Sequence, residues 1–176
     1  MSKNEMLGHA YCLFCRTGAE NRLKDEIETR FPSIRVLSAV QEKHKVIDKR
    51  YEVDRKNFLP GYLFLYSEEE MDFEMLLRIE DIYKILGDRI NAHELQGSDK
   101  AFAKWLWKND GVIGISRIRI IENKLKILSG PMQYFAKAVI KLDKHTKNAR
   151  VRMDFLGKKS DIWLAFEFDD EVAEGI

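Results

Sequence analysis

Two cysteines in the spacing Cys-x-x-Cys are the first residues in the chain that could do chemistry, as a redox pair or as half of a zinc site. Cys12 and Cys15 lie in the apolar segment of residues 10–16, which is predicted to be a strand. Positions three apart on a strand point to opposite faces, so the two thiols diverge. The chain has no second Cys-x-x-Cys, and its four histidines show no metal-ligand spacing. Both thiols are therefore predicted to be buried structural groups, and neither a metal nor a cofactor is expected.

Sequence motifs of the common enzyme classes do not occur in the chain. There is no nucleophile elbow, no His-Glu-x-x-His zinc motif, no phosphate-binding loop and no dinucleotide-binding glycine motif. The carboxylates occupy polar helix faces and the run of residues 68–70, which is typical of a solvated loop. We therefore predict that the protein is not an enzyme, with redox chemistry at Cys12 and Cys15 as the enzymatic alternative.

The composition is that of a folded protein. The 176 residues, 45% apolar and 34% charged, allow one medium domain or two small ones. Two cysteines are too few for a disulfide framework, and the first residues carry no secretory signal pattern. No apolar run approaches the ~20 residues that cross a bilayer. These observations predict a soluble, cytoplasmic protein.

Residues 1–110 are predicted to form an α+β sandwich. The pattern Thr17-x-x-Glu20 resembles a capping box and predicts a helix that Pro32 ends. A second helix is predicted to begin at Ser98 as its N-cap, and a short helix is expected over residues 72–79. The expected strands and ribbons are residues 10–16, 35–40, 62–66 and 82–86, with a polar ribbon over 41–57 that turns at 48–50. Strands and helices in this order favour a sheet with helices packed on it.

The pattern changes after Gly111 and Gly114. From residue 115 to residue 168, apolar and polar residues alternate between turn signals, without a helical period. Several short strands at this spacing predict a small antiparallel β-barrel. We therefore place a linker at residues 111–117 and a barrel domain at residues 118–176.

One strand is apolar on both faces. Tyr62, Phe64 and Tyr66 share one face, and Leu63 and Leu65 the other. A strand of this kind implies that something covers its second face. The cover is either a part of this chain, such as the helix that carries two tryptophans at positions 105 and 107, or a partner protein.

Charge is distributed unevenly, although its sum is only +1. Residues 117–159 hold twelve basic and three acidic side chains, a net charge of +9, whereas residues 160–176 hold six acidic side chains and no basic one. With residues 144–147 as a hairpin loop, the alternation places Lys141 opposite Arg150 and Val139 opposite Arg152. Like charges kept opposite each other suggest a surface that binds RNA phosphates. Alternatively, these long side chains extend into solvent.

Several segments together resemble the NusG family of transcription elongation factors. The opening AYCLFCRTGAENRL and the segments NFLPGYLFLY and IYKILGD are similar to the family's N-terminal domain. The stretch from NKLKILSGPM to IWLAFEF resembles its KOW domain, with a Gly-Pro turn and a Phe-x-Gly turn before the last strand. The resemblance covers roughly residues 10–170, and its motifs occur in the family's order.

The resemblance implies a factor that binds RNA polymerase and is not an enzyme. In the family, the N-terminal domain sits on the clamp helices of the largest polymerase subunit through an aromatic and aliphatic patch. The positions that match this patch are Phe14, Leu59, Tyr62 and Phe64. The KOW domain of the family contacts RNA, a ribosomal protein or a termination factor, and a monomer is expected.

Departures from the family pattern favour a specialised paralogue, similar to the operon-specific antiterminators RfaH and LoaP. The KOW glycine is replaced by Lys137, Leu59 replaces an aromatic residue, and the barrel is basic. LoaP reads a hairpin in the nascent leader RNA, which suits a basic β-rich domain. The side chains expected to meet RNA are Lys141, Lys144, Arg150, Arg152, Lys158 and Lys159. The resulting prediction is an elongation factor that promotes processive antitermination of selected operons. A ribosome-associated or RNA-binding KOW module, whose N-terminal domain merely dimerises, is the alternative.

Overall fold

The computed structural model describes residues 8–86 and 94–169, and its contacts divide the chain into two compact units. Unit 1 consists of Met1–Val40 and Asn57–Val112, and unit 2 of Gln41–Lys56 and Ile113–Ile176. The polar ribbon at residues 41–56, which the sequence-based boundary assigns to the first domain, therefore groups with the C-terminal residues. Neither helix has the length and apolar character that a membrane span requires, within the part of the chain that the structure describes.

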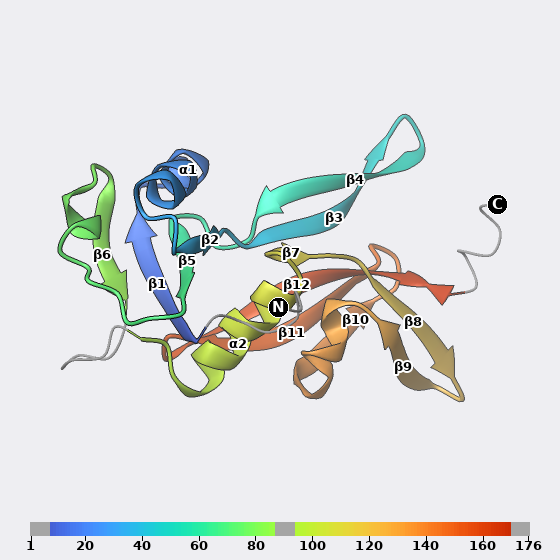
Figure 1. Ribbon diagram of the computed structural model, residues 1–176. Helices are drawn as coiled ribbons and strands as arrows, with labels where there is room; N and C mark the ends of the chain where they lie inside the picture. Colours follow the sequence, from blue (N-terminus) through green and yellow to red (C-terminus); the bar gives the residue numbers. More distant parts are fainter. Residues whose placement is uncertain (1–7, 87–93, 170–176) are drawn as a thin grey trace. The chain divides into compact units, whose positions relative to one another are not determined.

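Unit 1 contains a four-stranded antiparallel sheet in the order β2-β5-β1-β6 (Figure 1). Its strands are β1 (His9–Cys15), β2 (Arg35–Leu37), β5 (Tyr62–Ser67) and β6 (Ile82–Leu86). Helix α1 (Glu20–Arg30) packs its apolar stripe on one face, where Leu23 and Ile27 join the core formed with Leu13 and Leu63. Helix α2 (Gly97–Lys108) packs on the other face, since the Phe102 ring meets the Phe64 ring. The predicted α/β sandwich is confirmed.

The local details of unit 1 correct three sequence-based predictions. Thr17 does not cap α1, because the helix begins after Ala19 and has no side-chain cap. Ser98 lies inside α2, whose N-cap position is Gln96. The helix expected over residues 72–79 is reduced to the single 3₁₀ turn η1 (Leu76–Arg78). All three predictions used short-range signals, which identify an element more reliably than its ends.

The polar ribbon of unit 2 is an antiparallel hairpin of β3 (Val40–Ile47) and β4 (Arg50–Asn57). Its two-residue turn has positive φ angles of 49° at Asp48 and 64° at Lys49, the conformation that joins twisted strands tightly. The short strand β7 (Val112–Ile113) adds to β3. The hairpin predicted at this position is therefore confirmed.

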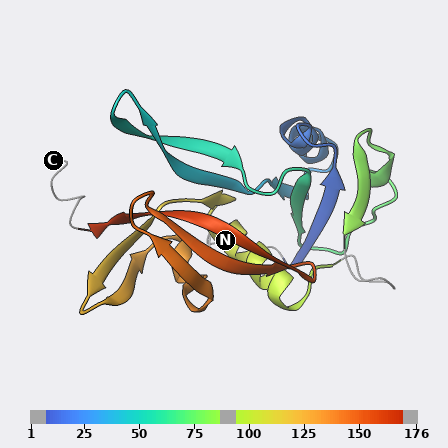
Figure 2. The ribbon, with the colours of Figure 1, turned by 180° about the vertical axis from the view of Figure 1, so that it is seen from behind.

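The remainder of unit 2 is a five-stranded sheet in the order β10-β11-β12-β8-β9, in which β11 and β12 lie side by side in both views (Figures 1 and 2). Its strands are β8 (Ser116–Ile121), β9 (Lys124–Ser129), β10 (Val139–Asp143), β11 (Asn148–Phe155) and β12 (Lys158–Phe168). Two 3₁₀ turns, η2 (Pro131–Gln133) and η3 (Ala136–Ala138), connect β9 to β10. The core is built from alternate residues such as Val151, Met153 and Phe166. The β-rich C-terminal part is confirmed, but β12 and β8 pair in parallel, so the sheet is not purely antiparallel as predicted.

The Gly-Pro turn of unit 2 depends on a glycine. Gly130 has a φ of 91°, and a Cβ atom at this position would lie 2.6 Å from the Cα of Ser116. The close approach lets the buried Ser116 Oγ accept a hydrogen bond from the Met132 backbone N–H at 2.9 Å. The turn is thereby fixed against β8.

Candidate functional site

The Pro-Gly-Tyr segment turns tightly against the end of β1. Gly61 has a φ of 83°, and a Cβ atom there would lie 3.0 Å from the Cys15 carbonyl oxygen and 3.1 Å from the Phe14 ring. The Gly61 carbonyl in turn accepts a hydrogen bond from the Cys15 N–H at 2.8 Å. Only a glycine combines this backbone conformation with such close packing. The turn therefore places the next residue, Tyr62, directly beside Phe14.

Glu20 holds this turn from the other side. Its buried carboxylate accepts backbone N–H hydrogen bonds from Gly18 and from Gly61, each at 2.7 Å. The sequence predicts that Glu20 reaches back to its own helix start, and the structure shows that it also ties α1 to the turn 41 residues away. A charged acceptor shared by two backbone donors makes strong hydrogen bonds.

Three aromatic side chains meet at this end of the sheet, and we call them the aromatic surface: Phe14, Tyr62 and Tyr83. Phe14 and Tyr62 are opposite each other across β1 and β5, with ring centroids 5.3 Å apart. The Tyr83 ring lies 5.7 Å from the Phe14 ring, and Tyr83 is 57% exposed. Phe14 and Tyr62 are half-buried. Clustered aromatic rings that are only partly covered are typical of a protein-binding surface.

Tyr83 was missed by the sequence reasoning. The β1–β6 pairing is irregular between Phe14 and Cys15, so Lys84 lies opposite Phe14 and Ile82 opposite Cys15. Tyr83 is the extra residue on β6, and such an irregularity redirects a side chain. Alternation alone could not identify this position, because the extra residue interrupts the period.

Phe64 does not belong to the aromatic surface. The side chain is fully buried, with its ring 5.9 Å from the Phe102 ring of α2. Tyr66 on the same face is also buried, with its ring tilted against the Trp107 ring at a centroid distance of 4.8 Å. Its hydroxyl donates a hydrogen bond to the Ala103 carbonyl at 2.8 Å. Helix α2 is thus the cover for this part of the strand, which is one of the two alternatives that the sequence left open.

Leu59 lies in the same turn as Gly61 and is half-buried. Its carbonyl accepts a hydrogen bond from the Tyr62 N–H at 3.1 Å, and its own N–H donates to the Asn57 side chain at 3.2 Å. Of the four positions matched to the family's patch, Phe14, Leu59 and Tyr62 therefore lie together near the turn, whereas Phe64 lies beneath α2.

Ion pairs lie close in sequence to the aromatic surface. Asp81 pairs with Arg22 at 2.5 Å and with Arg16 at 3.2 Å, and its carbonyl accepts the Arg16 N–H at 2.9 Å. Apolar rings with charged groups nearby have the composition of a protein interface.

The two cysteines are buried in unit 1 and are not bonded to each other. Burial raises the pKa of Cys15 to about 11 and raises that of Cys12 well above its usual value. Because the thiolate is the reactive form, neither thiol is suited to redox catalysis near neutral pH. No group of three metal-ligating side chains gathers among residues 8–86 and 94–169.

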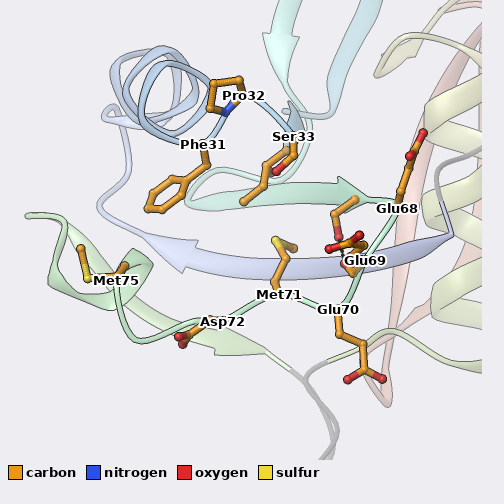
Figure 3. A pocket seen from close by; sticks show the side chains of 11 residues that line it. Phe31, Pro32, Ser33, Glu68, Glu69, Glu70, Met71, Asp72 and Met75 are labelled. Atoms are coloured by element: carbon orange, nitrogen blue, oxygen red, sulfur yellow. Dashed lines mark hydrogen bonds between the residues drawn. The ribbon is translucent and has the colours of Figure 1, made fainter.

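Unit 1 also has an acidic groove of about 610 Å³ (Figure 3). Phe31, Met71 and Met75 contribute apolar side chains to it, and its acidic lining comes from residues 68–70 and Asp72. The run of glutamates, predicted to be a solvated loop, is therefore one wall of a groove.

The basic residues of unit 2 are divided between paired and exposed positions. Lys141 is opposite Arg150 across β10 and β11, as predicted, but Val139 is opposite Val151 and not Arg152, because the register shifts between Val139 and Lys141. The predicted pairing of Lys141 with Arg150 is therefore confirmed, and that of Val139 with Arg152 is wrong.

Asp161 on β12 pairs with two of the candidate RNA-binding residues. Its carboxylate lies 3.0 Å from the Nε of Arg152 and 3.8 Å from the Nε of Arg150. Asp169 similarly pairs with Arg117 and Arg119. The acidic C-terminal stretch thus partly neutralises the basic block within the same unit, which the segment charges alone did not reveal.

The other four candidate RNA-binding residues are exposed. Lys158 and Lys159 follow the tight turn at Leu156 and Gly157, both with positive φ, and Lys144 lies in the β10–β11 turn after Lys141 on β10. The structure therefore brings together Lys141, Arg150 and Arg152 on neighbouring strands and places the two turn lysines at the other end of β11.

Comparison with protein families places these features in context. The family model described as "Transcription termination factor nusG" matches residues 9–101, which is more than half of the chain and includes the aromatic surface. The chain belongs to the NusG family. Members of this family are transcription factors that bind RNA polymerase and are not enzymes. No curated protein matches the chain.

Proposed function

We propose that the protein is a transcription elongation factor that docks on RNA polymerase through its aromatic surface and promotes processive antitermination of selected operons. The single observation that carries the proposal is the cluster of the half-buried Phe14 and Tyr62 with the exposed Tyr83, held by the Gly61 turn inside the family match. Leu59 lies in the same turn and extends the proposed contact. The clamp helices of the largest polymerase subunit are the proposed target. Phe64 would support this surface from within and would not touch the polymerase.

The proposal assigns residues 1–110, apart from the hairpin at residues 41–56 that groups with unit 2, to polymerase binding. Residues 118–176 are assigned to a KOW-type domain, joined by a linker at 111–117. Specialisation similar to that of RfaH or LoaP would come from nascent leader RNA that binds the basic strands of unit 2. The exposed lysines Lys141, Lys144, Lys158 and Lys159 support this part of the proposal, together with Arg150 and Arg152 beside Asp161. Such contacts reach mainly phosphates, which gives affinity and strong salt dependence.

Binding of purified core RNA polymerase tests the docking surface. We expect Tyr62→Ala to weaken binding about 30-fold or more, the effect of losing a central aromatic residue of an interface. Tyr51→Ala is the matched control, because Tyr51 is 63% exposed but lies on the hairpin of unit 2. Equal affinity for the wild type and Tyr62→Ala would contradict the proposed surface.

In vitro transcription through a terminator, with and without leader RNA upstream, tests the antitermination role. We expect the protein to increase read-through, and to do so more strongly when the leader is present. Normal termination in the presence of polymerase-bound protein would leave a factor that binds polymerase without antitermination. Failure to bind polymerase, together with RNA binding, would favour the plain RNA-binding module.

A further inference from the structure

Trp163 differs from the other tryptophans of the chain in its surroundings. Trp105 stacks on Phe102 with ring centroids 5.9 Å apart, and the Trp107 ring lies tilted against the Tyr66 ring at 4.8 Å, both within unit 1. Trp163 lies on β12 of unit 2 and is 39% exposed. Apolar aromatic surface that is exposed to water costs free energy, and a ligand that stacks on the ring recovers that free energy.

The strand register places two cations in the same row as Trp163. Trp163 is opposite Arg150 across β12 and β11, and Arg150 is opposite Lys141 across β11 and β10. Directly opposed residues project from the same face, with neighbouring strands about 4.8 Å apart. An exposed indole, a guanidinium and an ammonium therefore form a row across three strands, and an aromatic face beside cations is the combination that binds the bases and backbone of single-stranded nucleic acid.

Arg150, next to the indole, is restrained and incompletely satisfied. Asp161 lies 3.8 Å from its Nε, and this buried Nε has no hydrogen-bond partner among the described residues. A buried donor without an acceptor costs free energy. A phosphate oxygen brought into the row would supply an acceptor after a shift of this side chain.

The backbone under Trp163 is held in place. The amide of the buried Gln41 donates a hydrogen bond to the Trp163 carbonyl, and the ring of His44 lies within 3.1 Å of the Phe166 carbonyl. The next residues, Leu164 and Ala165, are buried. A stacking residue on such a strand is positioned more precisely than one on a loop.

We infer that Trp163 stacks on an unpaired base of RNA, with Arg150 and Lys141 meeting the adjoining phosphates. The ligand class is single-stranded RNA or the unpaired loop of a stem-loop, because bases inside a duplex are not available to an indole. This inference rests on the proposed RNA-binding role of unit 2 and adds a recognition element that phosphate contacts alone do not supply. The basic residues would give affinity, and Trp163 would give preference for unpaired nucleotides.

Titration of the full-length chain with a short oligouridine and with a blunt RNA duplex of equal length tests the inference. We expect Trp163→Ala to weaken oligouridine binding about 5- to 150-fold, as for other stacking aromatics, and duplex binding less than about twofold. Trp163→Phe keeps an aromatic face and should retain most of the affinity, whereas Trp163→Leu, apolar without a π-face, should not. The slope of affinity against salt should stay unchanged in all three variants, because none alters charge.

A second measurement reads the indole directly in the wild-type chain and uses a variant only to assign its signal. In protein labelled with 5-fluorotryptophan, Trp163→Phe identifies the ¹⁹F signal of Trp163. We expect oligouridine to shift this signal and to leave the signals of Trp105 and Trp107 unchanged. Oligouridine binding without a shift, or full affinity in Trp163→Ala, would overturn the inference.

Charge reversal separates this inference from the function on which it rests. If unit 2 binds RNA, the double variant Lys158→Glu, Lys159→Glu should bind both RNAs more weakly, and its affinity should depend less steeply on salt. If the charge reversal has that effect but Trp163→Ala binds both RNAs as tightly as the wild type, the stacking role is wrong and the RNA-binding function stands. If the wild-type chain binds no RNA at low salt, both the RNA-binding function and the stacking role are contradicted.

Discussion

The two units present surfaces of opposite character on similar scaffolds. In unit 1, a β-sheet carries an aromatic surface whose members contact one another, while the nearby charges are paired through Asp81. In unit 2, a β-sheet carries a row of cations, some paired with Asp161, and a single exposed indole. The first surface suits dehydration against another protein, and the second suits a wet, salt-dependent contact with a polyanion.

A difference within unit 1 explains how its surface arises. Tyr62, Phe64 and Tyr66 occupy one face of β5, but α2 covers only Phe64 and Tyr66. The same pattern of residues therefore serves as core at one end and as surface at the other. The position of one helix decides which aromatic residue is available to a partner.

The largest effect is expected from a substitution in the buried part of this face of β5. Phe64→Ala should lower the free energy of unfolding by about 3–5 kcal/mol, because it removes a fully buried ring and leaves a cavity. Tyr62→Ala should cost about 1 kcal/mol or less, as expected for a partly exposed side chain. Chemical denaturation followed by circular dichroism measures both. Similar losses for the two variants would show that the face is not divided as described.

A smaller effect is expected at the support of the aromatic surface. Glu20→Gln replaces one of two acceptor oxygens by an NH₂ group, which leaves a backbone N–H unsatisfied and should cost about 1–3 kcal/mol of unfolding free energy. Glu26→Gln is the control, because Glu26 only pairs with Arg22 and Arg30 at the surface. We expect that change to be below about 1 kcal/mol. If urea denaturation gave equal losses of unfolding free energy for the two variants, the hydrogen bonds of Glu20 to Gly18 and Gly61 would stabilise the protein no more than a surface ion pair does.

The smallest effect is expected at Asp161 in unit 2, and it tests whether this carboxylate restrains the arginines beside it. Asp161→Asn removes the carboxylate that pairs with Arg150 and Arg152, and should strengthen binding of single-stranded RNA about 1.5- to 5-fold. The salt dependence should become steeper, since two guanidinium groups become available to phosphates. Glu122→Gln makes the same change in net charge in the turn between β8 and β9. An equal gain in that variant would indicate a general charge effect and not release of the two arginines.

Much of the fold follows from the sequence, because its signals are local. The strands around Cys12 and Leu63, the helix ended by Pro32 and the turn at Asp48 occur close to the expected positions. The parallel pairing of β12 with β8 was not predictable, because alternation reports which face a residue occupies and not which strand lies beside it.

The candidate site was predicted less completely. Phe14 and Tyr62 were identified from the resemblance to the family's patch, but Phe64, which the same match includes, is buried, since exposure depends on where α2 packs. Tyr83 could be predicted only from the irregular pairing of β1 with β6. The pairing of Asp161 with Arg150 and Arg152 could be predicted only from the register of β11 and β12. Each of these depends on long-range placement, which composition and periodicity do not encode.

The hairpin of β3 and β4 has a consequence for how the chain can be divided. It is encoded between two stretches of unit 1, yet Gln41 and His44 supply hydrogen-bond partners to the last strand of unit 2. The polypeptide therefore crosses from one unit to the other three times, and a single cleavage at residues 111–117 would take the hairpin away from the strand that it supports. Proteolysis, gene fusion or exchange of the C-terminal half would have to carry residues 41–56 along to keep Trp163 anchored.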